Sequence, residues 1–264
     1  MKDVLYLDEA AAEYDRAFAH VSEHFLPFLL RTAKVSPGMR VLDVATGTGL
    51  AAQAVLAAVG ASGSVTATDI SPAMVERARK RLTGAGNVSV SVEDGQSLSF
   101  PDKSFDAVIC SLGLMFFPNP QQALSEFYRV LRPGGYAAVS VLTVPERSYN
   151  GRINVIIAPH APTFAETVKR TFALGSEAKL RSLFDAAGFR RLQITNSAHR
   201  FTLPTFDAYF GPFERGGGST GQAYVGLPRD VRVRVRQELR QSLGDTDGPV
   251  NIDVEFGFAG GLRS

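Results

Sequence analysis

The chain has 264 residues, with 28 Lys and Arg against 26 Asp and Glu, so its formal net charge at pH 7 is only +2. A charge this small gives no overall attraction to nucleic acid or to an anionic membrane, and an apolar share of 45% is enough for a sizeable core. The single cysteine, Cys110, excludes an internal disulfide framework and a cysteine-based zinc site. The charged start of the chain and the lack of a long apolar run predict neither a signal peptide nor a membrane span, so we expect a cytoplasmic protein.

Residues 8–33 carry apolar side chains at helical spacing, with Pro27 among them. The pattern predicts one or two helices broken near the proline. Tyr14 lies in this arm, and two interpretations are open for it. It either packs the arm onto the core or closes over a ligand.

The stretch Val41–Gly49 is the strongest local signal in the chain. An apolar strand runs into the turn Ala45-Thr46-Gly47-Thr48-Gly49, and a helix is expected to open at Leu50. Glycines let a ligand approach the backbone closely and a helix N-terminus offers unpaired N–H groups, so the pattern predicts a cofactor cradle. A second apolar strand ends at Asp69, whose carboxylate is suited to the two hydroxyls of a ribose.

Strands and helices then alternate along the chain. Ser71-Pro72 predicts a helix start, because serine is a good N-cap and proline fits the first turn. Strands are expected at 88–92, 105–111 and 136–142, and Arg132-Pro133-Gly134-Gly135 is expected to break a helix at 121–131. With later strands at 191–199 and 252–258, this order predicts an α/β fold with a Rossmann-like, doubly wound, mostly parallel seven-stranded sheet.

The stretch 201–250 is too long for a simple connection between the last two strands. We expect it to form a small helical cap, with Gly216-Gly217-Gly218 as a mobile joint. The predicted organisation is a single domain over residues 1–264. It has an N-terminal helical arm at 1–36, a core at 37–200 and 251–264, and the cap insertion at 201–250.

Five motifs follow one another through the first half of the chain. They are Val41–Gly49, Asp69-Ile70-Ser71-Pro72-Ala73-Met74, Glu93-Asp94-Gly95, Ser104-Phe105-Asp106-Ala107-Val108 and Arg129-Val130-Leu131-Arg132-Pro133-Gly134-Gly135. In this order they resemble the class I S-adenosylmethionine-dependent methyltransferases, most of all the ubiquinone and menaquinone biosynthesis methyltransferases. The resemblance covers roughly residues 37–142 and implies S-adenosylmethionine as cofactor.

The resemblance also implies which residues bind the cofactor. These are Asp43, Ala45, Gly47, Gly49, Asp69, Ile70, Asp94, Gly95, Gln96 and Ser111. The glycines would lie against the methionine part, Asp43 near its ammonium and Ser111 near its carboxylate. Asp69 would accept from the ribose, and Asp94 would accept from the adenine amino group. A simpler interpretation is open for two of these residues. Asp43 could only fix the glycine turn, and Asp94 could be an ordinary acidic residue of a turn.

Methyl transfer from a sulfonium requires in-line placement of the acceptor and exclusion of water more than covalent catalysis. A base is needed only where the acceptor must lose a proton, and the candidates are His160 and His199, although a lone histidine is more often structural or exposed. The residues expected to border the acceptor are Tyr14, Met115, Phe116, Phe117 and Phe210. Aromatic side chains there would suit a small, largely apolar or aromatic molecule, unless they form the cap's own core.

Three other functions are open from the sequence. A nicotinamide oxidoreductase is disfavoured, because the turn lacks the regular G-x-G-x-x-G spacing. A protein that binds S-adenosylmethionine without methyl transfer, as a scaffold or rearrangement catalyst, is a second alternative. An RNA methyltransferase is the third, because arginines alternate with valines between Arg229 and Arg240, on a helix or a strand. We expect these arginines to form a solvent-exposed face instead. We therefore expect neither a nucleic-acid partner nor a bound metal ion. A homodimer is possible from the sequence.

Overall fold

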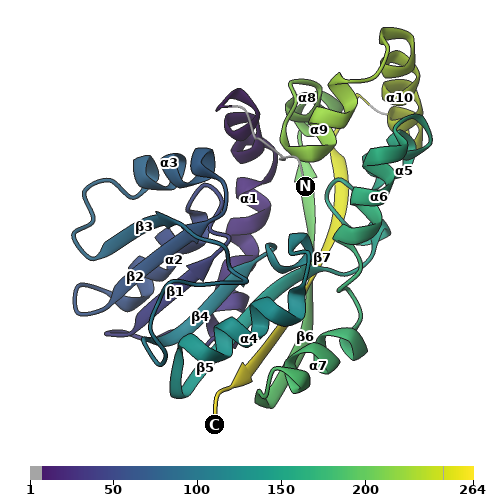
Figure 1. The fold of residues 1–264 in the computed structure, drawn as a ribbon. Coiled ribbons are helices and arrows are strands. Elements are labelled where there is room, and N and C mark those ends of the chain that lie inside the picture. The colour runs from purple at the N-terminus through teal and green to yellow at the C-terminus, as the bar shows by residue number, and fades with distance from the viewer. Residues whose placement is uncertain (1–7, 246) are drawn as a thin grey trace. The chain divides into compact units, whose positions relative to one another are not determined.

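The computed structural model describes residues 8–245 and 247–264, without the side chains of residues 8–12 and Tyr14. The chain divides into two compact units, here called the sheet unit and the helical unit (Figure 1). The sheet unit contains Ser22–Val141, Leu174–Ser197 and Phe256–Ser264. The helical unit contains the described residues up to Val21, together with Leu142–Ala173 and Ala198–Glu255.

Seven strands form one sheet in the order β3-β2-β1-β4-β5-β7-β6. The strands are β1 (Arg40–Val44), β2 (Ser64–Asp69), β3 (Val88–Val92), β4 (Phe105–Ser111), β5 (Leu131–Leu142), β6 (Arg190–Leu203) and β7 (Val250–Leu262). The first five pair with one another in parallel. The central strands are apolar runs, and Val41, Leu42 and Ala107–Cys110 are fully buried, as expected for parallel strands covered on both faces. The predicted Rossmann-like α/β fold with seven strands is confirmed.

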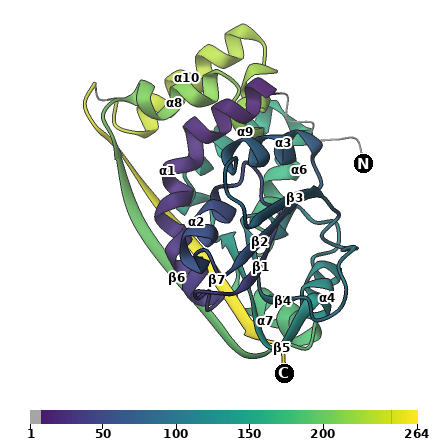
Figure 2. The ribbon, with the colours of Figure 1, turned by 90° about the vertical axis from the view of Figure 1, so that its left-hand side faces the viewer.

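Helices cover both faces of this sheet. The helices and the short helix of the sheet unit are α2 (Leu50–Val59), α3 (Pro72–Arg81), η1 (Leu114–Phe116), α4 (Pro120–Val130) and α7 (Glu177–Ala186), with the second half of α1 (Asp8–Thr32). Figure 2 shows α1 and α2 on one face and α4 and α7 on the other. The predicted helix start at Ser71-Pro72 is confirmed, because Ser71 caps α3 by accepting from the Met74 amide. Asn119 caps α4 in the same way by accepting from the Gln122 amide.

Two local expectations in the sheet unit are wrong. The helix α1 is continuous through Pro27, whose ring is exposed, so the missing amide hydrogen bond falls on the solvent side while Phe25 and Leu29 stay buried on the other. Arg132-Pro133-Gly134-Gly135 lies within β5 as an irregularity of the pairing with β4, rather than before the strand. The amide of Gly134, which has a φ of +84°, donates to the carbonyl of Arg263, and the Arg263 amide donates to Gly135, so β7 holds the turn in place.

The helical unit consists mostly of helices. Its elements are the first part of α1, η2 (Pro145–Arg147), α5 (Gly151–Ile157), η3 (Ala158–His160), α6 (Pro162–Thr171), α8 (Phe206–Glu214), α9 (Gly218–Val225), α10 (Arg229–Ser242) and the adjoining parts of β6 and β7. Three helices therefore separate β6 from β7 in the chain. The Val-Arg alternation lies on the helix α10, where Val231, Val235 and Leu239 form the buried face.

The three glycines between α8 and α9 are packed rather than free. Gly216, Gly217 and Gly218 are all buried. A Cβ on Gly217 would lie 2.8 Å from the carbonyl oxygen of Pro212, and one on Gly221, in the first turn of α9, would lie 2.5 Å from the backbone of Gly216. The expected mobile joint is therefore a close contact between two helices that only residues without a side chain permit.

We predict that Gly221→Ala destabilises the helical unit by about 1–3 kcal/mol, because the added methyl group meets backbone on two sides. Gly226→Ala is the matched control at the other end of α9, where φ is −72° and an added Cβ has its nearest neighbour at 3.4 Å. It should change stability by no more than about 0.5 kcal/mol. Urea unfolding followed by circular dichroism measures both. Equal effects of the two substitutions would contradict the packing argument.

Candidate functional site

The carboxyl ends of β1 to β4 lie at one edge of the sheet and carry the predicted cofactor residues. The strand β1 runs into the glycine turn, β2 ends at Asp69, β3 is followed by Asp94, and β4 ends at Ser111. The pairing of Val44 with Thr68, Asp69 with Val92 and Asp43 with Ile109 sets these ends beside one another. This edge is where α/β folds bind their ligands.

The glycine turn uses its two glycines for different purposes. Gly47 and Gly49 both have positive φ angles, of +56° and +88°. A Cβ on Gly47 would meet nothing within 4 Å, so the turn is open on that side. A Cβ on Gly49 would lie 3.1 Å from the Cα of Ala78, so the second glycine is needed for the approach of α3. Ala45 also has a positive φ, of +57°. This conformation costs an alanine roughly 1–2 kcal/mol, so a glycine would suit the position better.

Asp69 is a structural bridge as well as a candidate ligand. Its Oδ2 accepts the Gly47 amide and its Oδ1 accepts the Ser71 amide, both at 2.9 Å. Burial raises the pKa of the Asp69 carboxyl, while these two amides oppose the rise. The side chain thus ties the glycine turn to the start of α3. Each oxygen keeps a second lone pair, which is the capacity that two hydroxyl donors require.

Asp43 is fully buried at the end of β1. Its Oδ2 accepts from the Thr46 hydroxyl at 2.6 Å, so the carboxylate does fix the turn. Its Oδ1 is buried and accepts no hydrogen bond from the part of the chain that the structure describes. Burial raises the pKa of the Asp43 carboxyl to about 7 and the charge of Asp69 adds to the rise, while the Thr46 hydroxyl and the Ala52 amide oppose it. An unsatisfied buried oxygen of this kind fits a positively charged ligand group.

The loop after β3 carries Asp94, Gly95 and Gln96. Asp94 Oδ1 accepts from the Gln96 amide at 2.9 Å, which closes a local turn and leaves Oδ2 outside that bond. A Cβ on Gly95 would lie 2.6 Å from the ring of Phe117 and 2.7 Å from Val44, so only glycine fits. The Gln96 side chain accepts from the Asn119 amide at 2.8 Å, so it joins the loop to the start of α4.

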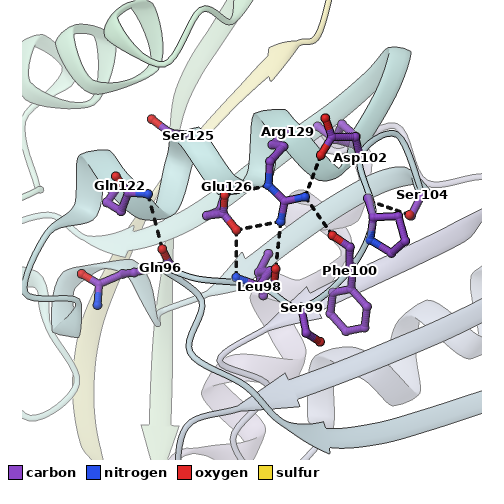
Figure 3. Close-up of polar contacts among 12 residues, drawn as sticks. Gln96, Leu98, Ser99, Phe100, Asp102, Ser104, Gln122, Ser125, Glu126 and Arg129 are labelled. Carbon is purple, nitrogen blue, oxygen red and sulfur yellow. Dashed lines mark hydrogen bonds and ion pairs between the residues drawn. The ribbon is translucent and has the colours of Figure 1, made fainter.

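Two residues of α4 that the sequence prediction did not single out hold the rest of this loop (Figure 3). The Arg129 guanidinium donates to the carbonyls of Leu98 and Phe100 and to the carboxylate of Asp102, at 2.8–2.9 Å. Glu126 accepts from the Leu98 amide at 2.8 Å and from Arg129. Donation by Arg129 lowers the pKa of Glu126, so this carboxylate is charged at neutral pH. The only sequence signal was an acid and an arginine three residues apart before the Pro-Gly-Gly turn.

Apolar side chains are exposed at the same edge. Ile70 and Phe116 are 63% and 57% exposed. Met115 is buried, and Phe117 packs against Gly95. The Ser111 hydroxyl lies 3.5 Å from that of Ser140. Phe116 is therefore the one member of the predicted acceptor group in the sheet unit that is largely open to solvent.

The remaining predicted residues belong to the helical unit. Phe210 is fully buried among Phe213, Phe206 and Tyr224, within the aromatic core of that unit. His160 is exposed on η3, and His199 is exposed on β6 with its ring against Phe201. The Tyr14 side chain lies outside the described residues.

The arginines of α10 form ion pairs. Arg236 pairs with Glu214 and Asp207, Arg240 with Asp245, and Arg234 with Asp230. Within residues 8–245 and 247–264, no group of three or more His, Cys, Asp or Glu side chains is placed to hold a metal ion. In the same ranges, no helix combines the length and the apolar character that a membrane crossing requires.

Comparison with known proteins identifies the sheet unit's family. A family model described as a methyltransferase domain matches residues 42–139. An uncharacterised protein of Mycobacterium tuberculosis is 31% identical over 202 residues, which cover 75% of this chain and 71% of that protein. The ubiquinone/menaquinone biosynthesis C-methyltransferase of Laribacter hongkongensis is 45% identical over 109 residues, which cover 41% of this chain and 45% of that enzyme.

Solved structures show the same fold. The YcgJ protein of Bacillus subtilis matches with a TM-score of 0.61 at 21% identity, over 91% of this chain and 98% of that one. A Haemonchus contortus phosphoethanolamine N-methyltransferase in complex with S-adenosyl-L-methionine matches with a TM-score of 0.62 at 18% identity, over 98% of this chain and 58% of that one. The motif order, the strand order and these likenesses agree. The chain belongs to the class I S-adenosylmethionine-dependent methyltransferases, and S-adenosylmethionine is its cofactor.

Proposed function

We propose that this enzyme transfers the methyl group of S-adenosylmethionine to a small, largely apolar or aromatic molecule by in-line displacement. The observation that carries the proposal is the buried Asp43 carboxylate, whose Oδ1 accepts no hydrogen bond from the described residues, beside a glycine turn that is open at Gly47. A cationic amino-acid group meets both requirements, because it supplies a hydrogen-bond donor and a charge to pair with the carboxylate. Asp69, with its remaining lone pairs, would then bind the ribose hydroxyls, and the exposed Ile70 would cover one face of the adenine.

The acceptor class is inferred from the same edge of the sheet unit. Phe116 exposes its ring at the end of η1, five residues after β4 ends at Ser111. A ring in this position suits an apolar or aromatic acceptor better than a polyanion. Three of the five arginines of α10, Arg234, Arg236 and Arg240, are paired with carboxylates, which weakens the case for nucleic acid as the acceptor. The Laribacter relative is named for ubiquinone and menaquinone biosynthesis, which supports a small, largely apolar acceptor.

When bound, S-adenosylmethionine supplies a methyl group that its positive sulfur has already activated. The chain's own work is then binding, orientation and exclusion of water, and these effects can supply most of the rate enhancement. Asp43 and Asp69 would fix the two halves of the cofactor, and Phe116 would orient the acceptor. A general base is needed only for an acceptor that must lose a proton. His160, His199, Tyr14 and Phe210 stay predictions from the sequence.

A labelled-methyl screen tests the acceptor class. The protein is incubated with methyl-labelled S-adenosylmethionine and with small phenols, quinones and amines, beside RNA and protein pools. We expect label in at least one small molecule, together with equimolar S-adenosylhomocysteine. Label found only in the macromolecules would overturn the proposed acceptor. Binding of S-adenosylmethionine without labelled product in any pool would favour a binding protein over a transferase.

We predict that Asp69→Ala weakens S-adenosylhomocysteine binding by about 2–4 kcal/mol, because two hydroxyl donors lose a charged acceptor. The substitution should also lower the free energy of unfolding by about 1–3 kcal/mol, because the Gly47 and Ser71 amides lose their acceptor. Glu93→Gln is the control, since this carboxylate bonds only Ser99 among the described residues. Calorimetry and urea unfolding measure the two effects, and wild-type affinity in the Asp69 variant would refute the ribose assignment.

We predict that S-adenosylhomocysteine affinity rises roughly tenfold between pH 6 and pH 8. Asp43 has a pKa of about 7 in the free protein and is protonated below it. Because the ligand's ammonium group favours the ionised carboxylate, binding below pH 7 must first release a proton, and this cost disappears as pH rises. The Asp43→Asn variant should bind more weakly and lose the pH dependence. Calorimetry over this range decides, and a variant with an unchanged pH profile would contradict the role of Asp43.

A further inference from the structure

The loop of residues 93–104 is the least regular part of the candidate site. It joins β3 to β4 and contains no helix or strand of its own. Yet it carries Asp94, which the proposed function assigns to the adenine amino group. A single carboxylate can select for an amino group only if the backbone that carries it is held in one position. The contacts that hold this loop therefore bear on how selectively the protein binds adenine.

The helix α4 holds the loop at two places. At its N-terminus, the Asn119 amide donates to the Gln96 side chain at 2.8 Å and Gln122 donates to the Gln96 carbonyl at 3.4 Å. One to three turns further on, Glu126 and Arg129 bond the segment Leu98–Asp102. Figure 3 shows the Gln122 contact and the contacts of Glu126 and Arg129 reaching from α4 to the same loop.

The second place of attachment is the stronger one. Leu98 uses both backbone groups, since its amide donates to Glu126 and its carbonyl accepts from Arg129. The two side chains are joined to each other by two hydrogen bonds of 2.8 Å, which fixes both in one geometry. Their exposed fractions, 13% for Glu126 and 31% for Arg129, indicate partial shielding from water, which strengthens the pair.

Neither residue is required for packing of α4 on the sheet. The buried face of the helix is Ala123, Leu124, Phe127 and Val130. Glu126 and Arg129 lie off this face and bond the loop instead. We propose that Glu126 and Arg129 are positioning residues that hold the Asp94–Gln96 turn where it selects the adenine of the cofactor. This inference rests on the proposed function, and specifically on Asp94 facing the adenine amino group.

The test compares S-adenosylhomocysteine with its inosine analogue, in which a carbonyl oxygen replaces the adenine amino group. Asp94 would accept from the amino group and repel the carbonyl, so the wild-type protein should prefer the adenosine ligand by at least about tenfold. In Arg129→Met the preference should fall to about twofold or less, because the turn loses its fixed position. Ser125→Ala is the matched control on the same helix, since this hydroxyl bonds only the Gln121 carbonyl within α4 among the described residues. It should keep the full preference.

Loss of stability alone would not change the ratio of the two affinities, so the ratio separates positioning from a merely structural role. A variant Arg129→Met that binds and keeps the wild-type preference would overturn the inference. So would a wild-type protein that binds S-adenosylhomocysteine but does not discriminate against the inosine analogue. A wild-type protein that binds neither ligand would instead refute the proposed function.

Glu126→Gln keeps the test decisive if Arg129→Met does not fold. It preserves the shape of the side chain but removes the charge that pairs with Arg129, so the preference should fall by about threefold or more. Hydrogen exchange of the Leu98 amide is a second measurement on the same variant. We expect faster exchange at Leu98 and unchanged exchange in β4. Wild-type values for both the preference and the exchange rate would overturn the inference.

Discussion

The carboxylate of Asp69 is the contact on which the rest of the site depends. One side chain at the end of β2 accepts the amide of Gly47 in the turn after β1 and the amide of Ser71 at the start of α3. These bonds fix the turn from one side, while the contact of Gly49 with Ala78 fixes it from the other. The turn can therefore keep Ala45 and Gly47 at positive φ and remain open where a ligand approaches. In the proposed function, the same oxygens that hold the turn would also bind the cofactor.

The sheet could be predicted from the sequence because its signals are local. The apolar run of β4 and the Ser71-Pro72 cap each act within a few residues. The two predictions that were wrong depended on the tertiary structure. The turn Arg132–Gly135 is part of β5 because Arg263, far along the chain, bonds both of its glycines. The proline in α1 is tolerated because its ring faces solvent, which the spacing of apolar residues alone does not reveal.

Some residues of the candidate site could likewise be predicted from the sequence and others could not. Acidic residues directly after strands, such as Asp69 and Asp94, could be found from the sequence because parallel strands bring their ends to one edge. Arg129 could not, since its loop partners lie 27 to 31 residues away and no local pattern links them. The sequence also could not show that Asp69 accepts backbone amides, or that Asp43 is fully buried against the Thr46 hydroxyl. These properties exist only once the strands are side by side.

The division into units has a consequence for how such an enzyme diversifies. The family model ends at residue 139 and lies wholly inside the sheet unit, as does each hydrogen bond described above for the turn, Asp69, Asp43 and the loop after β3. The helical unit is assembled from three separate stretches of chain. Insertions or exchanges in those stretches would leave these hydrogen-bonding residues of the sheet unit in place. Natural selection can therefore alter one half of the molecule through several independent loops while the other half remains under the strict constraint of a shared ligand.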